Sequence, residues 1–262
     1  FVSSYFDKYF YALPEKWGKP IDVGLFPHGA IGVEFFFLLS GFLMMKHIDS
    51  NDESRNVVEA TFQFLKRKMK VFYPYFLFSM VLAFITRLSI SQFDKTHLAL
   101  FCEEAILEII LVKQVRFGNG VWLNGACWFL SAMLICMALI YPVLYKYRNS
   151  ILKIYLPLFC IFCLGVLYSE GSLVASRSII SKEYRWMLRA LTEISIGCMC
   201  YEASRFINSL RLSKLASIIL GILEVTGYLF VIAFAYRFKT LGGTVFDYMC
   251  LIVLAVSITI TF

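Results

Sequence analysis

Residues 29–43 read GAIGVEFFFLLSGFL, an apolar run that a single carboxylate, Glu34, interrupts. At about 100° per residue, Ala30, Glu34 and Gly41 lie near one face of a helix, where small side chains let a second helix come close. A carboxylate in a membrane span is energetically unfavourable and usually faces the bundle interior or a wet cavity. The run therefore predicts a membrane helix in which Glu34 either contributes to a functional cavity or only pairs with a buried Arg.

The rest of the chain has the composition of a membrane protein. Of its 262 residues, 60% are hydrophobic and only 16% are charged, whereas soluble domains carry about 25% charged residues. A soluble fold of this length has no interior for so much apolar surface, and a bilayer provides a second place for it. The net charge is +7, with basic residues at the ends of apolar runs. This pattern favours membrane lipids over nucleic acid as partners.

Apolar runs of span length recur along the chain and predict an all-α, polytopic transmembrane bundle that forms a single domain over residues 1–262. We expect an amphipathic or re-entrant helix at 97–112, because this stretch has helical spacing but carries several Glu residues. About seven spans are expected, at 30–45, 71–86, 127–145, 151–168, 186–201, 215–236 and 245–262.

The basic residues give this bundle an orientation. Segments 46–70, 146–153 and 204–215 carry as many Lys and Arg residues as the other connections do, in about half the length. Cytoplasmic segments are enriched in Lys and Arg, so these three are placed in the cytoplasm. The sequence starts at Phe1 without a Met and stops in an apolar run at Phe262, so we expect it to be truncated at both ends.

No metal-binding or soluble-enzyme motif is present. His28, His47 and His97 are the only histidines and stand apart, and GxSxG, P-loop and GxGxxG patterns are missing. Seven of the eight cysteines lie in apolar segments, which is typical of small buried side chains. We therefore expect no metal site and no hydrolase, kinase or Rossmann chemistry.

A basic segment precedes the second expected span. Residues 66–75 read KRKMKVFYPY, in which Lys66, Arg67 and Lys70 share a helix face and Lys68 points elsewhere. Pro74 has no N–H for the carbonyl of Lys70, which favours a kink and a free carbonyl. Such a cluster suits a phosphate-rich ligand. Its alternative is an ordinary cytoplasmic anchor, which the spacing alone favours.

Two later positions are also candidates. Trp128 opens the run WFLSAML and fits an interfacial belt of aromatic residues. Arg189 and Glu193 are four residues apart inside an expected span. They can pair with each other across one helical turn, or one of them can contact a ligand.

Taken in order, these segments resemble the membrane-bound acyltransferase 3 family. Residues 32–42 are similar to its signature, 66–75 to its basic segment before a proline, and 128–134 to its next recurrent segment. LRAL at 188–191, followed by Ile196-Gly197, resembles a later one. The resemblance covers most of the chain and implies a bundle of about ten membrane helices.

The resemblance also implies an activity. Such an integral membrane O-acyltransferase, often an O-acetyltransferase, takes an acyl group from acyl-CoA, commonly acetyl-CoA, as co-substrate. It places the group on a hydroxyl of a carbohydrate or lipid-linked glycan, as in polysaccharide modification at the bacterial cell surface. This implies a location in the bacterial inner, or plasma, membrane. Holding the CoA phosphates is then the expected role of Lys66, Arg67, Lys68 and Lys70.

The family's catalytic His, preceded by an Arg, lies in its first membrane helix, and no helix of this chain matches it. The expected His lies upstream of Phe1, so we expect this fragment to be inactive by itself. Glu34 is a candidate for lining the cavity, and Arg189 for stabilising the acyl carbonyl or pairing with Glu34. Helix packing is the expected role of Gly32, Ser40, Gly41, Pro74 and Trp128.

Two other classes of function remain open at this point. In a transporter or flippase of a lipid-linked glycan, Glu34, Arg189 and Glu224 inside spans would form a substrate path. The missing signal of an inverted repeat weighs against this class. The third class is a catalytically inactive membrane scaffold.

Overall fold

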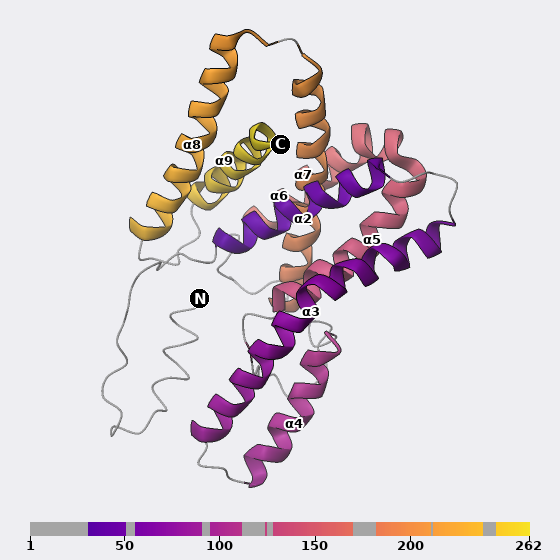
Figure 1. The fold of residues 1–262 in the computed structure, drawn as a ribbon, viewed down its shortest axis with the longest axis vertical. Coiled ribbons are helices and arrows are strands. Elements are labelled where there is room, and N and C mark those ends of the chain that lie inside the picture. The colour runs from indigo at the N-terminus through magenta and orange to yellow at the C-terminus, as the bar shows by residue number, and fades with distance from the viewer. Residues whose placement is uncertain are drawn as a thin grey trace. The chain divides into compact units, whose positions relative to one another are not determined.

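The computed structural model of the chain describes residues 31–50, 56–90, 95–111, 124, 128–169, 182–210, 212–237 and 245–262. The regular structure of these residues is helical, in agreement with the predicted all-α class (Figure 1). The chain falls into two compact units, of which one combines residues 1–51 with 147–262 and the other comprises 52–146. The single domain over 1–262 stays a prediction.

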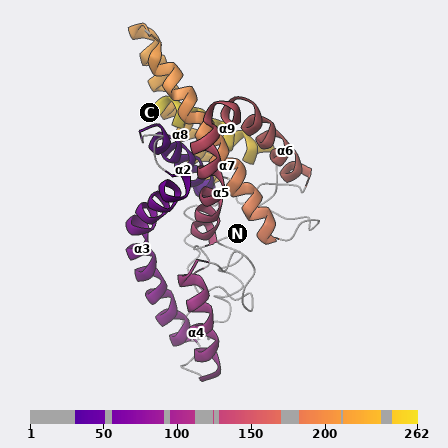
Figure 2. The ribbon, with the colours of Figure 1, turned by 90° about the vertical axis from the view of Figure 1, so that its right-hand side faces the viewer.

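The first unit is built around one long helix. Its elements are α2 (Ile31–Asp49), the π-helix η4 (Ile151–Tyr155), α6 (Leu156–Ser169), α7 (Lys182–Ser209), α8 (Lys214–Arg237) and α9 (Val245–Thr261). α7 is central because α2, α6 and α9 all pack against it, while α8 packs on α9 (Figure 2). Buried apolar side chains from these helices form the core, among them Leu38, Phe42, Leu167, Cys200, Val231 and Leu254.

The backbones of α2 and α7 touch at two glycines. A Cβ atom added to Gly41 would lie 2.8 Å from the carbonyl carbon of Ile194, and one added to Gly197 would lie 2.9 Å from that of Leu38. Such distances are shorter than real Cβ contacts, and the neighbours are backbone atoms that cannot move aside. Small residues are what permits close approach of two helices. Here they set the position at which α2 crosses α7.

The second unit contains α3 (Val57–Ile90), α4 (Lys95–Ile109) and most of α5 (Trp128–Ser150). α3 packs on α4 through a cluster of buried side chains: Phe76, Met80, Phe101 and Leu111. The hydroxyl of Tyr73 donates to the carbonyl of Ile109 at 3.1 Å. α3 also contacts α5 in this unit, because the ring of Phe64 stacks on the ring of Tyr141 with centroids 4.5 Å apart.

Each run expected to span the membrane lies in a helix, but several boundaries differ from the prediction. α3 begins at Val57, so most of segment 46–70 that the structure describes is helical, and Pro74 lies within the helix without ending it. The helical run also continues through 146–150, the short connection left between the spans expected at 127–145 and 151–168. These residues include neither Gly nor Pro, so the stop signals of a helix are missing. The backbone departs from helical values only at Tyr147, with φ −125° and ψ 35°.

Four segments among the described residues are long and apolar enough to cross a membrane: Ile31–Asp49, Val57–Ser89, Trp128–Ser169 and Lys214–Arg237. The third has 42 residues, which is about twice the length of one crossing. α9 is apolar but shorter, and α7, which carries several charged residues, is not among these segments. The membrane class is therefore supported, whereas the count of seven spans stays a prediction.

The other sequence expectations have mixed outcomes. The helix expected at 97–112 is present as α4. Ala30, His28 and residues 1–29 lie outside the described residues, as does Cys127. Glu224 lies on α8 and accepts a hydrogen bond from the hydroxyl of Thr261 at 2.9 Å, so it is attached to the end of α9.

Candidate functional site

Three charged side chains meet in the interior of the first unit. The guanidinium of Arg189, on α7, forms an ion pair with Glu34 of α2 through Nη2 and Oε1. Its Nε atom donates to Oε1 of Glu193, one turn further along α7, at 3.2 Å. The side chains are 2% exposed for Arg189 and Glu34 and 0% for Glu193. We call these three residues the buried cluster. In this cluster one cation is paired with two carboxylates.

The glycine crossing explains why these residues meet. On α7, Arg189, Glu193 and Gly197 follow at intervals of four residues, and on α2 Glu34 precedes Gly41 by seven. Both spacings keep residues on one face of a helix. Because Gly41 and Gly197 bring these two faces into backbone contact, the charged residues before them must also face each other. A single sequence pattern therefore supplies both the close packing and the charges.

The buried cluster leaves acceptor atoms unused. Among the residues that the structure describes, Oε2 of Glu34 and Oε2 of Glu193 have no hydrogen-bond partner, although both are buried. The same holds for the hydroxyls of Ser195 and Tyr248. A buried polar atom without a partner costs about 1–3 kcal/mol, and more when it is charged. Ionised carboxylate oxygens accept hydrogen bonds, so these two oxygens have the chemistry to accept from hydroxyl donors.

Sequence reasoning missed further buried charges in this unit. Arg185 on α7 and Asp247 on α9 are each about as buried as the members of the cluster. The span expected at 186–201 left Arg185 out, although it precedes Arg189 by one helical turn and extends the same interval of four residues. Asp247 stands at the start of an apolar run, where a lone carboxylate is itself a signal.

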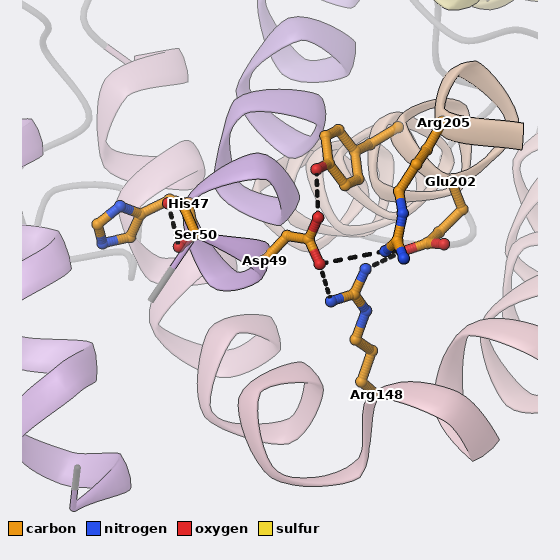
Figure 3. A network of polar contacts seen from close by, with 7 residues as sticks. His47, Asp49, Ser50, Arg148, Glu202 and Arg205 are labelled. Carbon is orange, nitrogen blue, oxygen red and sulfur yellow. Dashed lines mark hydrogen bonds and ion pairs between the residues drawn. The ribbon is translucent and has the colours of Figure 1, made fainter. Parts of the chain in front are cut away.

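A second set of charges lies at the other ends of α2 and α7 (Figure 3). Arg148, at the end of α5, forms ion pairs with Asp49 through Nη1 and with Glu202 through Nη2. Arg205 approaches Asp49 at 3.1 Å, and the hydroxyl of Tyr201 donates to Asp49 at 2.7 Å. We call these five residues the end network. Its ion-pairing side chains are partly to well exposed.

The end network joins the three segments that the sequence places on one side of the membrane. Asp49 belongs to segment 46–70, Arg148 to 146–153 and Arg205 to 204–215. Contacts among three such segments are possible only if all of them lie on the same side. The two contacts, Arg148 with Asp49 and Arg205 with Asp49, are thus consistent with a common side for the three segments.

The predicted basic segment lies on α3, in the second unit. Lys66, Arg67 and Lys70 are exposed, whereas Lys68 is half-buried, as expected for three residues on one face and one on another. Within the described part of the chain, these four residues form no ion pair. Their cationic face is thus open to an anionic ligand.

The remaining predicted residues have different surroundings. Ser40 is buried beside Gly41, and Trp128 opens α5 in a half-buried position. Gly32 is exposed, and a Cβ added there would meet no described atom within 4 Å. Pro74 is an exposed residue of α3. Of the small residues proposed for packing on α2, Gly41 is the one at which the structure shows helix contact that a Cβ would block.

The fold and the site define a class, namely an all-helical membrane protein whose interior holds a charged cluster between closely packed helices. Residues 3–262 match the model of the acyltransferase domain family, known as acyltransferase 3, and the chain belongs to this family. The match confirms the family that the sequence resembles. No curated protein and no solved structure matches the chain.

Proposed function

We propose that the protein transfers an acyl group, with acetyl as the expected one, from acyl-CoA to a hydroxyl of a cell-surface carbohydrate. Family membership supports acyl transfer. The observation that carries the acceptor chemistry is the buried cluster, because Glu34 and Glu193 each keep an unpaired carboxylate oxygen among the described residues. Carboxylates accept hydrogen bonds, and a carbohydrate is a dense array of hydroxyl donors.

The chemistry assigns distinct tasks to these side chains. In the reaction, the acceptor oxygen attacks the thioester carbonyl carbon, the carbon–sulfur bond breaks, and the hydroxyl proton passes through a general base to the departing sulfur. Glu34 and Glu193 bind neighbouring hydroxyls and fix the direction of the attacking oxygen. Arg189 holds both carboxylates in place through its planar fork of donors. We assign no general base within this chain.

The acyl donor requires a different set of residues. CoA carries several phosphate groups, and Lys66, Arg67 and Lys70 form an exposed cationic face on α3. Arg binds phosphate as a fork and Lys as a point charge, and Lys68 adds charge at the edge of the face. We place this face on the cytoplasmic side of a bacterial inner membrane, where acyl-CoA is present. The density of Lys and Arg in segments 46–70, 146–153 and 204–215 supports this orientation.

The test is an acyl-transfer assay with the full-length protein in liposomes. Release of the CoA thiol from acetyl-CoA is followed in the presence of an O-deacetylated bacterial polysaccharide. Glu34→Gln keeps the size of the side chain but removes its charge, and we expect kcat to fall about tenfold to a hundredfold. The paired variant Arg67→Ala/Lys70→Ala should instead raise KM for acetyl-CoA.

The matched control is Glu224→Gln, which changes the same group on α8, where the carboxylate binds Thr261. Its turnover should equal that of the unchanged protein. An unchanged kcat in Glu34→Gln would remove the acceptor role of the buried cluster. Glycan movement across the liposome without acetyl-CoA, and without thiol release, would replace acyl transfer by transport.

A further inference from the structure

A pocket opens beside the end network, away from the buried cluster. It has a volume of about 240 Å³ and is lined by Arg148, Asn149, Leu152, Lys153, Met199 and Glu202. Its residues come from α5, η4 and α7, all in the first unit. The volume is below the range of about 300–1,000 Å³ typical for sites of drug-sized ligands. It therefore fits a headgroup rather than a whole coenzyme.

The backbone around this pocket is irregular in two places. The chain leaves helical geometry at Tyr147, next to Arg148. Four residues later the π-helix η4 begins, and the N–H of Leu156 donates to the carbonyl of Ile151, five residues back. π-Helical turns are rare and occur frequently at functional sites. The wider turn places Leu152 and Lys153 at the pocket wall.

The lining has the chemistry of an anion site with an apolar side. Arg148 and Lys153 bring two positive charges against the one negative charge of Glu202, and Asn149 adds amide donors. In the described residues Lys153 has no ion pair. The two terminal nitrogens of Arg148 are paired with Asp49 and Glu202. An arriving anion therefore competes with Glu202 for the guanidinium of Arg148.

The position along the chain indicates where the anion comes from. Residues 146–153, which include three Lys or Arg residues, separate two apolar stretches, and the exposed rings of Tyr147 and Tyr155 flank the pocket residues. Tyr is enriched at the level of lipid headgroups. α6 continues directly from η4 and exposes an apolar row that consists of Leu158, Ile161 and Phe162. A lipid whose head lies in the pocket can extend its acyl chains along this row.

We propose that this pocket binds the phosphate group of an anionic phospholipid, with Arg148, Lys153 and Asn149 as its donors. The site is separate from the residues to which the proposed acyl transfer is assigned. Bound lipid also weakens one contact of the end network, because the phosphate accepts a hydrogen bond from the Arg148 nitrogen that otherwise donates to Glu202. The lipid therefore acts on a contact that joins α5 to α7.

The test measures lipid retention by the full-length protein. The protein is placed in nanodiscs of phosphatidylcholine with a minor share of phosphatidylglycerol, and bound lipid is counted by native mass spectrometry. One Lys near a membrane surface contributes enough attraction for about a fivefold change in binding of an anionic lipid. Lys153→Gln should lower phosphatidylglycerol retention by about this factor, while the exposed Lys214→Gln, at the start of α8, should not.

A second variant tests the opposite sign. Glu202→Gln keeps the side-chain volume but removes the negative charge from the lining, so phosphatidylglycerol retention should rise. Equal retention in Lys153→Gln and Lys214→Gln, or a fall in Glu202→Gln, would overturn the site. Displacement of the lipid by an equal concentration of soluble glycerol phosphate would overturn its assignment to a lipid. Thermal unfolding of each variant identifies a loss that is caused by misfolding.

Discussion

The buried cluster and the end network use the same chemistry in opposite surroundings. In each, one Arg stands between two carboxylates and connects α2 to a neighbouring helix. The buried cluster is withdrawn from solvent, whereas the side chains of the end network are 19–55% exposed. Burial makes the loss of a partner severe because no water replaces it. The exposed pairs are screened and worth little individually. Along the same two helices, the loss of one charge should therefore matter much more in the buried cluster than in the end network.

The largest difference is expected from Arg189→Met. This change removes the cation that, among the described residues, is paired with Glu34 and Glu193, and it leaves the two carboxylates in a buried place. Breaking a buried ion pair on one side destabilises a protein by about 3–5 kcal/mol. The measurement is unfolding of the purified protein followed by helical circular dichroism.

A triple variant with Glu34→Gln, Arg189→Met and Glu193→Gln sharpens this test. With no charge left in the cluster, most of the lost stability should return, because replacing a complete buried pair is often neutral. If Arg189→Met unfolds like the unchanged protein, the cluster is hydrated and the contrast in solvation between the two regions fails.

The next effect concerns the crossing between the two regions. Gly41→Ala places a methyl group against the backbone of Ile194, and overpacking of this kind costs about 1–3 kcal/mol. Gly32→Ala is the matched control on the same helix, since its Cβ meets no described atom within 4 Å. Ala favours a helix over Gly by up to about 1 kcal/mol, so the control should be neutral or stabilising. Equal effects of both variants on unfolding would contradict the close crossing.

The smallest effect is expected at the end network. Asp49→Asn removes a charge that Arg148, Arg205 and Tyr201 contact, and exposed pairs contribute about 0–1 kcal/mol each. At 1 M salt the screening length falls to about 3 Å, so the difference between Asp49→Asn and the unchanged protein should shrink. A loss as large as that of Arg189→Met, unaffected by salt, would mean that the network is solvent-excluded.

Sequence reasoning predicted the candidate residues best where the signal comes from residues a few positions apart in the chain. Glu34 in an apolar run and Arg189 four residues before Glu193 identified all members of the buried cluster. Each pairing of Arg189, with Glu193 and with Glu34, was left open against a ligand role, and the structure shows both pairings on one guanidinium. Which helix lies against α2 is a matter of packing, and no single-helix pattern determines it.

The misses have physical reasons too. Hydropathy marks the apolar part of a helix, so it found 71–86 but not the first half of α3, which carries three Lys, one Arg and one Gln between residues 63 and 70. These residues are good helix formers. The end network went unnoticed because Arg148 and Arg205 look like ordinary positive-inside anchors. Their carboxylate partners lie 54, 99 and 156 residues away along the chain, apart from Glu202, which precedes Arg205 by three residues.

The glycine crossing limits how α2 and α7 can move. A slide of one residue along either axis, about 1.5 Å, would bring a Cβ into the space that Gly41 leaves for the Ile194 carbonyl. We expect a tilt about the crossing to be the easier motion, because it displaces the backbone atoms at the crossing least. The crossing thus works as a pivot, with the buried cluster on one arm of each helix and the end network on the other. A tilt of α2 against α7 that widens the gap around Glu34 therefore also shifts the ion pairs of Asp49 at the other end of α2.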